Sequence, residues 1–419
     1  MIQSNQEVIK KKVLYAQAVY GNEEKQAVLK SLENGWLAAG PLVKEFEEKV
    51  AKHFGKKYGI AVNSGSSANL LAIKALGIEK GSEVITPACT FATTVSEIVN
   101  NDLVPVFVDS MIGTYTIDEN LVEDAITAKT KAILVPQLVG GICDMIQLRE
   151  IADKHGLWLI DDSCDTFAPI FEGKTVASYA DVTTTSFYGS HIITACGGGG
   201  MVLTDDEKVR DRVICLKDWG RVGNDAEAFE SRFDFEIDGI PYDSKFLYAE
   251  LGYNLKMNES MAAFGLEQLK KLPQFTKTRQ ENFNALRKGL VDYIGHPAHE
   301  VSEYFYLPWL KGGPTKETET NWLAFPLTIK EDAPFKRYDL LKYLENNGIM
   351  VRVLFSGNIT RHPLYKANGF VWRQSGLLPN ADYIMANGFL VGCHSGMGKE
   401  ETDYVVEKIR EFVDVRSKV

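Results

Sequence analysis

The stretch KAILVPQLVGGICDMIQLREIADKHGLWLIDD, residues 131–162, contains the unit from which the fold class can be predicted. Short apolar runs at 131–137 and 157–162 enclose an amphipathic segment at 145–156. Both runs are too apolar for strands with one exposed face, which indicates strands buried in a parallel sheet. The segment between them has the spacing of an amphipathic helix, so the stretch predicts a strand, a helix and a second strand.

The same alternation extends on both sides, from about residue 56 to residue 215. Further strands are predicted at KYGIAV (57–62), EVITP (83–87), VPVFVD (104–109), VTTTSF (182–187) and GMVLT (200–204). Helices are predicted between them, at SSANLLAIKAL (66–76) and TVSEIVNN (94–101) among others. Alternating strands and helices predict a doubly wound α/β domain, with a mostly parallel central sheet flanked by helices.

The pattern changes after a helix predicted at 259–272. The later segments predict a polar helix at 276–295, strands at WLAFPLTI (322–329) and IMVRVLF (349–355), and helices at RYDLLKYLENNG (337–348) and ETDYVVEKIREFV (401–413). We therefore expect a large domain over residues 1–275, with an N-terminal helical arm, and a smaller C-terminal α+β domain over 276–419.

The composition of the 419 residues is that of an ordinary globular protein, with 45% hydrophobic and 24% charged residues. The formal net charge of −10 argues against a broad nucleic-acid footprint. The polar start has no signal-peptide core, and no apolar run approaches the roughly 18 residues needed to cross a bilayer. We expect a cytoplasmic protein that binds neither nucleic acid nor membrane. The six scattered cysteines form no CxxC pair, so neither a metal site nor a disulfide framework is predicted.

Two turns could place polar groups at the carboxyl edge of the sheet. NSGSSANL (63–70) follows a strand and opens a helix, so its backbone N–H groups and hydroxyls could bind phosphate. Asp161, Asp162 and Asp165 lie at the carboxyl end of the strand LWLI, at the edge where open α/β sheets bind ligands. Each turn also has a structural interpretation, as an ordinary helix start and as an acidic capping loop.

A third segment, SFYGSHIITACGGGGMV (186–202), combines Ser186, His191 and four consecutive glycines. A single histidine can be structural rather than catalytic. A run of glycines loses much conformational freedom on folding, which favours a tight turn or a close approach of the backbone to a ligand.

These motifs, in this order, resemble the DegT/DnrJ/EryC1/StrS sugar aminotransferase family of fold-type I pyridoxal-phosphate (PLP) proteins. The resemblance covers nearly the whole chain. It includes NGWLAAGPLVKEFEEKVAKHFG (34–55), TPACTFATTVSE (86–97), LIDDSCDTFA (159–168), LGYNLKMNESMAA (251–263) and LFSGNITRHP (354–363). It implies an enzyme of nucleotide-linked keto-sugars that uses PLP or its amine form, pyridoxamine 5'-phosphate (PMP).

One position departs from the family's aminotransferases. They carry a cofactor-binding lysine five residues after the serine of the S-F motif, whereas this chain has His191 there and no lysine between Lys174 and Lys208. A lysine can both tether the cofactor and move protons, whereas histidine can only move protons. Histidine here is similar to the family's sugar 3-dehydratase branch, known from the colitose and ascarylose pathways. That branch removes the C3 hydroxyl of a nucleotide-linked 4-keto-6-deoxyhexose during 3,6-dideoxysugar biosynthesis for O-antigen or related glycans.

The resemblance also implies roles for individual residues. His191 is the expected base, Asp162 the partner of the pyridinium nitrogen and Phe91 the aromatic side chain on the ring face. Asp165 is expected near the phenolic oxygen of the ring. The expected contacts around the phosphate are Ser66, Ser67, Ala68, Ser186 and Asn254. Because Asn254 is expected to reach the phosphate from the partner subunit, the resemblance implies a homodimer with shared active sites.

The replacement of C–OH by C–H is a two-electron reduction, so the reaction needs a reductant. In the colitose type, glutamate restores the amine form of the cofactor and leaves as 2-oxoglutarate. In the ascarylose type, a [2Fe–2S] cluster supplies the electrons, and its cysteines lie between the WGR and LGYN motifs. The corresponding residues here, 222–250, contain no cysteine, which favours glutamate.

Two other functions remain open on the sequence alone. The protein could be a sugar aminotransferase that tolerates histidine and makes an amino sugar. It could also be a catalytically silent paralogue that binds cofactor or sugar without turnover.

Overall fold

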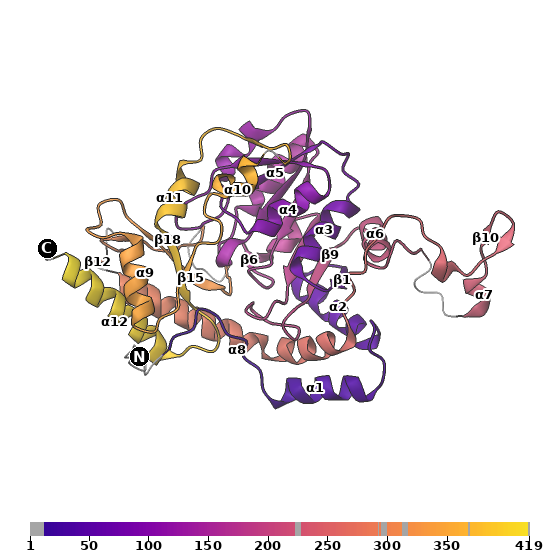
Figure 1. The fold of residues 1–419 in the computed structure, drawn as a ribbon, viewed down its shortest axis with the longest axis horizontal. Coiled ribbons are helices and arrows are strands. Elements are labelled where there is room, and N and C mark those ends of the chain that lie inside the picture. Colours follow the sequence, from indigo (N-terminus) through magenta and orange to yellow (C-terminus); the bar gives the residue numbers. More distant parts are fainter. Residues whose placement is uncertain are drawn as a thin grey trace, which may run out of the picture.

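The computed structural model describes residues 12–222, 228–291, 293–294, 300–311, 317–367 and 369–417. Most of the polar start, residues 1–11, lies outside the described residues. The elements are arranged as a large α/β part and a smaller part that share one long helix (Figure 1).

The helices and strands have the following bounds. The α-helices are α1 (Asn22–Glu33), α2 (Pro41–Phe54), α3 (Gly65–Ala75), α4 (Ala92–Asn100), α5 (Met145–His155), α6 (Glu207–Lys217), α7 (Phe229–Arg232), α8 (Glu259–Leu290), α9 (Arg337–Asn346), α10 (Pro363–Lys366), α11 (Pro379–Asn387) and α12 (Lys399–Arg416). The short 3-10 helices are η1 (Glu119–Leu121), η2 (Glu123–Ala125), η3 (Leu138–Gly140), η4 (Val176–Tyr179), η5 (Ser244–Phe246) and η6 (Ile359–Arg361). The strands are β1 (Tyr58–Val62), β2 (Glu83–Pro87), β3 (Val104–Val108), β4 (Thr130–Pro136), β5 (Trp158–Asp162), β6 (Ile170–Phe171), β7 (Lys174–Thr175), β8 (Val182–Ser186), β9 (Gly200–Thr204), β10 (Glu236–Ile237), β11 (Ile240–Pro241), β12 (Tyr293–Ile294), β13 (Glu300–Val301), β14 (Phe305–Tyr306), β15 (Ala324–Ile329), β16 (Arg352–Val353), β17 (Arg373–Gln374) and β18 (Gly388–Gly392).

An eight-stranded sheet in the order β1-β9-β8-β5-β4-β2-β3-β17 forms the centre of the large part. Strand β9 is antiparallel to both of its neighbours, and the other neighbouring pairs in the sheet are parallel. Every residue of β2, β8 and β9 is buried, as the unbroken apolar runs predicted. The predicted α/β fold with a mostly parallel central sheet is therefore confirmed.

Capping residues at both ends explain the bounds of α5, the helix predicted at 145–156. The side chain of Asp144 accepts a hydrogen bond from the backbone N–H of Gln147 at 3.0 Å and so starts α5. Gly156 ends the helix in the left-handed conformation, with φ of 63°. Met145, Leu148, Ile151 and Ala152 are the buried residues of α5. Their spacing is the helical periodicity on which the prediction rested.

The two helices predicted at 259–272 and 276–295 are a single helix, α8, and the predicted break was wrong. The helix continues through Pro273, because Leu272 and Phe275 on either side of it are both buried and continue the same apolar face. A proline inside a helix removes one backbone hydrogen bond, which buried neighbours can outweigh.

The predicted domain boundary between residues 275 and 276 lies inside α8. The C-terminal region also returns to the large sheet, where β17 pairs with β3, and near the N-terminus Val13 pairs with Ile349. The division into domains over 1–275 and 276–419 stays a prediction.

The smaller part is built on a four-stranded sheet in the order β14-β15-β18-β16. Its strands β15 and β16 and its helices α9 and α12 lie within the segments predicted from the sequence, give or take three residues. One continuous apolar cluster joins this part to α5 and the large sheet, with Phe283 of α8 stacked on Trp322 at 4.1 Å between ring centroids. Packing of this kind fixes the two parts against each other around α8.

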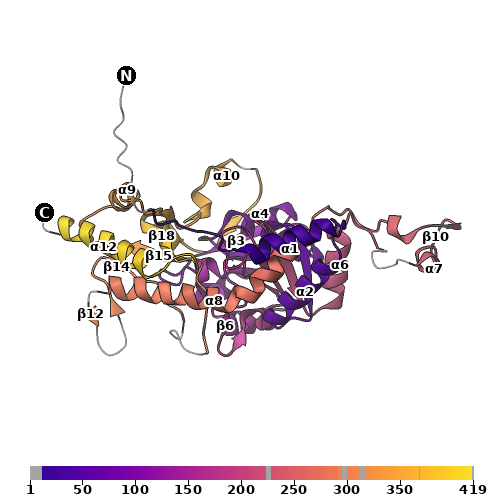
Figure 2. The ribbon, with the colours of Figure 1, turned by 90° about the horizontal axis from the view of Figure 1, so that it is seen from below.

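A projecting arm, which we define as residues 228–251, extends from the large part beyond α6. It contains α7, β10, β11 and η5, and both views show it reaching away from the body (Figures 1 and 2). A two-stranded hairpin of this kind is marginally stable by itself. Within the described ranges, no helix is long and apolar enough to cross a membrane.

Candidate active site

The predicted site residues gather at one edge of the large sheet. Asp162 ends β5 and Ser186 ends β8, while Ser66 lies in the first turn of α3 and Phe91 directly precedes α4. The parallel strands all end at this edge, which is where ligands bind in open α/β sheets. His191 follows β8 in the connection to β9.

A cavity of about 360 Å³ opens at this edge, and we call it the edge cavity. Its volume lies in the usual range for small-molecule sites, about 300–1,000 Å³. It is lined by six of the predicted residues, Ser66, Phe91, Asp162, Asp165, Ser186 and His191. The structure therefore brings together the three motifs that the sequence placed far apart.

The start of α3 is packed against the end of β8. Ser64 caps the helix and accepts a hydrogen bond from the N–H of Ser67 at 3.1 Å, and the N–H of Ala68 donates to the Ser64 carbonyl at 3.0 Å. Ser67 and Ala68 do not line the edge cavity, unlike Gly65 and Ser66. A Cβ at Gly65 would lie 2.7 Å from the Cβ of Ser186, so only glycine allows this close approach.

Asp162 is buried and held by three donors. Its Oδ2 accepts from the side chains of Asn69 and Thr94, each at 2.9 Å, and its Oδ1 accepts from the backbone N–H of Cys164 at 3.2 Å. These bonds fix the orientation of the carboxylate, which lines the edge cavity. A fixed carboxylate of this kind can hold a proton on a nitrogen atom of a bound ring.

The two other predicted aspartates have different surroundings. Asp165 lines the edge cavity and accepts from the N–H of Val139 at 2.9 Å, and burial raises its pKa to about 7. Asp161 lies on the other side of β5, where its Oδ1 accepts from Gln137 at 2.9 Å and its Oδ2 from Ser163 at 2.8 Å. Burial raises the pKa of Asp161 to about 7 as well. Asp161 does not line the edge cavity and so has a structural role.

His191 lies in a tight turn whose backbone is bonded on both sides. Its N–H donates to the carbonyl of Tyr188 at 3.0 Å, and its carbonyl accepts from Arg279 at 3.3 Å. Burial, assisted by the charge of Arg279, lowers the pKa of His191 from 6.5 to about 4. Its Nδ1 is buried and has no hydrogen-bond partner among the described residues. The imidazole is therefore neutral at pH 7 and can accept a proton.

The glycine run after His191 forms the turn into β9. Gly197 and Gly199 have positive φ of 92° and 106°, a region that favours glycine. A Cβ at Gly200 would lie 2.3 Å from the carbonyl oxygen of Ser64. The run therefore forms the tight turn, which was one of the two expectations, and Gly198 and Gly199 line the edge cavity.

Several residues of the edge cavity escaped the sequence reasoning: Tyr15, Asn69, Thr94, Tyr188, Leu323 and Phe355. Asn69 follows Ser66 by one helical turn, so its spacing could have revealed it. Tyr15, Leu323 and Phe355 come from distant segments that no local pattern connects with the edge cavity. The rings of Phe355 and Phe91 pack edge to face with 5.6 Å between their centroids, so the half-exposed Phe91 is in contact with another aromatic residue of the edge cavity.

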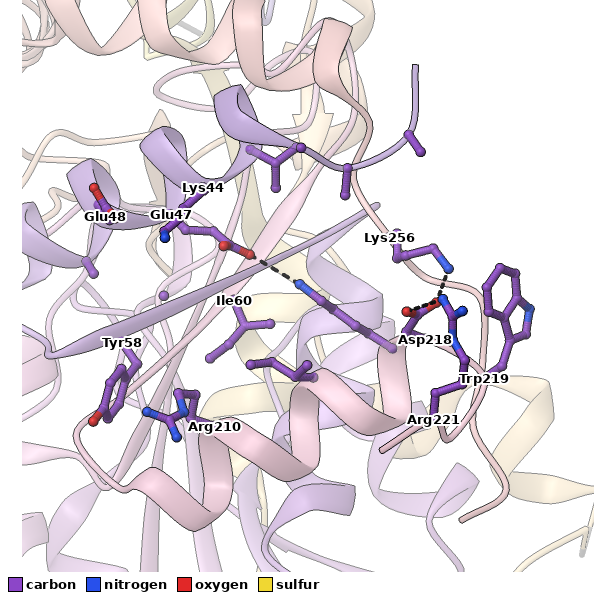
Figure 3. Close-up of a pocket in the computed structure, with 18 of the residues that line it drawn as sticks. Lys44, Glu47, Glu48, Tyr58, Ile60, Arg210, Asp218, Trp219, Arg221 and Lys256 are labelled. Atoms are coloured by element: carbon purple, nitrogen blue, oxygen red, sulfur yellow. Dashed lines mark hydrogen bonds and ion pairs between the residues drawn. The ribbon is translucent and has the colours of Figure 1, made fainter. Parts of the chain in front are cut away.

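Asn254 does not line the edge cavity of its own chain. Its backbone pairs with Asp218, beside a second cavity of about 850 Å³ that we call the large cavity (Figure 3). There Lys256 and Arg221 both pair with the carboxylate of Asp218, and the Lys256 ammonium lies 3.2 Å from the centre of the Trp219 ring. None of the predicted site residues lines the large cavity.

The edge cavity fits a phosphorylated pyridine cofactor. A helix start with serine hydroxyls suits a phosphate, Asp162 suits a ring nitrogen, and the aromatic Phe91 suits a ring face. Among the described residues that line it there is no lysine or arginine. A cofactor here would therefore not be tethered to the wall by a lysine, and His191 would be the neutral base beside it.

Comparisons with known proteins agree with this geometry. The lipopolysaccharide biosynthesis protein RfbH of Salmonella typhimurium is 38% identical over 408 residues, which cover 94% of this chain and 90% of that protein. A dTDP-4-dehydro-2,6-dideoxy-D-glucose 3-dehydratase of Saccharopolyspora spinosa is 37% identical over 411 residues, or 94% of this chain and 85% of that protein.

A solved structure of GDP-4-keto-6-deoxymannose-3-dehydratase, with a trapped PLP-glutamate geminal diamine, superposes with a TM-score of 0.83. It is 28% identical and covers 95% of this chain and 100% of that chain. The family model described as the DegT/DnrJ/EryC1/StrS aminotransferase family matches residues 19–410. The match spans both parts of the molecule, and the chain therefore belongs to this family.

Proposed function

We propose that this protein is a PLP/PMP-dependent dehydratase that removes the C3 hydroxyl of a nucleotide-linked 4-keto-6-deoxyhexose, with His191 as the base. The observation that carries the proposal is the neutral histidine of the edge cavity, at the position where the family's aminotransferases have lysine. The S. spinosa relative is named a 3-dehydratase, which supports the same reaction class. The Salmonella relative supports a place in lipopolysaccharide biosynthesis.

When bound, PMP supplies an amine for the sugar ketone and an aromatic ring that withdraws electrons from the adjacent carbon. Asp162 keeps a proton on the ring nitrogen, because its three hydrogen bonds hold the carboxylate in place. Phe91 covers the ring face, and the start of α3 with Ser66 and Ser186 takes the phosphate. Asp165 lies near the phenolic oxygen in this arrangement.

With PMP and the keto-sugar bound, His191 would accept a proton from the methylene carbon of PMP, and the bound cofactor would supply the electrons that replace the C3 hydroxyl. Its low pKa keeps the imidazole unprotonated at neutral pH, so the base is available without a further activating group. Because histidine cannot tether the cofactor, hydrolysis can release the deoxygenated sugar.

Glutamate is the proposed amino donor. One glutamate is oxidised to 2-oxoglutarate, and one ammonia leaves, for each C–OH that becomes C–H. Residues 222–250 contain no cysteine, and the superposed dehydratase structure holds PLP and glutamate together. Both observations support an amino-acid reductant rather than an iron–sulfur cluster.

We also propose a homodimer with shared active sites. The cofactor phosphate and the diphosphate of the substrate are anionic, yet the described lining of the edge cavity carries no lysine or arginine. Lys256 lies two residues from Asn254 in the sequence, Arg221 is joined to Asn254 through Asp218, and both cations line the large cavity. A second copy that brings Asn254 to the phosphate would supply these cations as well.

A product assay tests the reaction. The purified protein is incubated with PLP and with GDP-, CDP-, dTDP- and UDP-linked 4-keto-6-deoxyhexoses, with and without glutamate, and the products are measured by mass spectrometry. We expect one substrate to lose a single oxygen only when glutamate is present, with one 2-oxoglutarate formed per product. His191→Asn should still bind PMP but form no product.

Other outcomes identify the alternatives. An amino sugar would show an aminotransferase, and binding of cofactor without any turnover across the panel would indicate a silent paralogue. Dehydration without 2-oxoglutarate would contradict glutamate as the donor.

A further inference from the structure

Arg279, near the middle of α8, is the largest fully buried side chain among the described residues. Within the described ranges no carboxylate forms an ion pair with it, and its Nε has no hydrogen-bond partner. A buried guanidinium without an acidic partner is costly, so its retention calls for a reason beyond packing.

The guanidinium connects two segments that both contribute to the lining of the edge cavity, through His191 and Leu323. Its Nη1 donates to the carbonyls of Trp322 and Leu323 at 2.9 and 3.0 Å, directly before β15. Its Nη2 donates to the carbonyl of His191 at 3.3 Å. One rigid, planar group therefore fixes the turn that carries His191 against the start of β15.

The same hydrogen bonds continue to Asp165. The N–H of Leu323 donates to the carbonyl of Val139 at 2.9 Å, and the N–H of Val139 donates to Oδ2 of Asp165 at 2.9 Å. Val139 has φ of 60°, a strained left-handed conformation for a β-branched residue. Such strain persists only where the surrounding contacts hold the backbone, and Arg279 is the charged end of this chain of contacts.

We propose that Arg279 is a positioning residue for the edge cavity: it holds His191 and Asp165 in register through backbone hydrogen bonds, and it places a buried cation, without a carboxylate partner among the described residues, beside the turn that carries His191. The proposal rests on the proposed function only for the role of His191 as the base.

The charge of Arg279 acts on His191 because it is buried, although burial of the imidazole is the larger cause of its lowered pKa and a hydrogen bond with the Ser186 backbone opposes both. Burial lowers the pKa of His191, and Arg279 lowers it further; the pKa of His394 is lowered by the same two causes. The other ionisable groups that line the edge cavity around His191 are Tyr15, Asp162, Cys164, Asp165 and Tyr188. Among the described residues, Arg279 is the one charged group that shifts the pKa of the His191 imidazole.

Two variants distinguish the effect of the charge of Arg279 from the effect of its hydrogen bonds. Arg279→Met removes both, whereas Arg279→Lys keeps the charge. We expect Arg279→Met to lower kcat on the order of 100-fold, because a small misplacement of reacting groups has an effect of that size. The acid limb of its pH–rate profile should move to higher pH, toward the usual pKa of histidine. Arg279→Lys should lose part of kcat, because lysine cannot reach both carbonyls, but keep the acid limb in place.

Arg337 provides a matched control. It also lies on a helix and also donates to two carbonyls, those of Met385 and Gly388, but none of these three residues lines the edge cavity. Arg337→Met and Arg337→Lys should leave both kcat and the acid limb unchanged, even where they lower stability.

A second readout does not need turnover. In protein labelled with ¹⁵N-histidine, the His191 signal is assigned by its absence from His191→Asn, and its titration gives the pKa directly. We expect a higher pKa in Arg279→Met, an unchanged one in Arg279→Lys, and wild-type affinity for PMP in both.

If Arg279→Met leaves either kcat or the titration of His191 as in wild type, the proposal is overturned. If this variant does not fold, Arg279→Lys decides, and wild-type kcat in that variant overturns the proposal. If the wild-type protein converts no substrate, the proposed function fails, while the titration of His191 still decides the effect of Arg279.

Discussion

His191 differs from a lysine at the same place in what it can do with a carbonyl group. Its imidazole forms no stable imine, whereas the amine of a lysine would. We therefore expect His191→Lys to bind PLP covalently, with the shifted absorption of an imine and a lysine adduct that borohydride traps.

The neighbouring Ser190→Lys is the control, because Ser190 also lines the edge cavity. It should show neither the shift nor the adduct. An unchanged spectrum in His191→Lys would mean that this position does not face the cofactor, and a trapped adduct in wild type would contradict the dehydratase.

Asp161 gives the stability of the protein a pH dependence of predictable sign. Burial raises its pKa from 3.8 to about 7, so the folded protein holds a proton that the unfolded chain has released. The contribution of Asp161 to stability is therefore present below pH 4 and is lost as the pH rises toward 7. Asp161→Asn removes this loss, so its stability relative to wild type should rise with pH, at most by about 1.4 kcal/mol per pH unit.

Urea unfolding at several pH values between 5 and 8 measures the effect. Asp102→Asn is the control: this exposed carboxylate pairs with Lys80 at 2.7 Å, and that hydrogen bond lowers its pKa. The carboxylate of Asp102 is ionised in both the folded and the unfolded protein throughout this pH range. The difference in the free energy of unfolding between Asp102→Asn and wild type should therefore not change with pH. A flat difference for Asp161→Asn would contradict the raised pKa.

At the scale of elements, α1 is attached to α8 by a buried carboxylate. Glu24 is fully buried and accepts from Gln268 at 2.7 Å and Lys271 at 2.8 Å, both on α8. It also accepts from the N–H of Gly21 at 2.7 Å, which caps α1. Glu24→Ala removes all three of these hydrogen bonds and leaves the N–H of Gly21 without its cap, so it should lower the free energy of unfolding by roughly 2–3 kcal/mol.

Glu23 offers a close comparison on the same helix, since it pairs with the same Lys271 at 3.2 Å but is exposed. Glu23→Ala should change stability little. Hydrogen exchange should show α1 loosened in Glu24→Ala alone. Equal protection of α1 in both variants would contradict the anchoring role of Glu24.

Elements that depend on local pattern could be predicted, and those that depend on distant contacts could not. The strands β2 and β9 match their predicted bounds because each is an uninterrupted buried apolar run. The continuity of α8 through Pro273 depends on an apolar face that only packing reveals. The pairing of β17 with β3 joins segments far apart in the sequence, so no window could predict it.

The candidate site divides in the same way. The motif residues Asp162, Ser186 and His191 could be found because they follow strands that end at one sheet edge. Tyr15 and Arg279 could not, because their importance lies in which backbone groups and side chains they meet after folding.

At the scale of the whole molecule, the projecting arm is too apolar for a surface that stays in water. Its exposed side chains include Phe229, Ile240, Tyr248 and Leu251, the last of which is 93% exposed. Large exposed apolar patches mark interaction surfaces, and the proposed second copy would cover this one. We expect Leu251→Asp to convert a dimer into monomers in sedimentation velocity experiments.

Leu377 is the matched control, because it is also a strongly exposed leucine, at 80%, but lies outside the projecting arm. Leu377→Asp should sediment as wild type. A monomeric wild-type protein, or a Leu251→Asp variant that sediments as a dimer, would contradict a dimer built through the projecting arm.

The antiparallel strand of the large sheet has a consequence for how this family changes chemistry. Because β9 pairs antiparallel with β8, the segment that carries His191 is a hairpin connection, and the pair Ser186–Gly200 fixes both of its ends. No crossover helix interrupts it, but Ile192 and Ile193 pack into the same buried apolar cluster as Phe46 of α2 and Leu269 of α8. A graft of residues 187–199 from a lysine-bearing relative would therefore have to keep these buried side chains in order to change the group at position 191 without disturbing the helices.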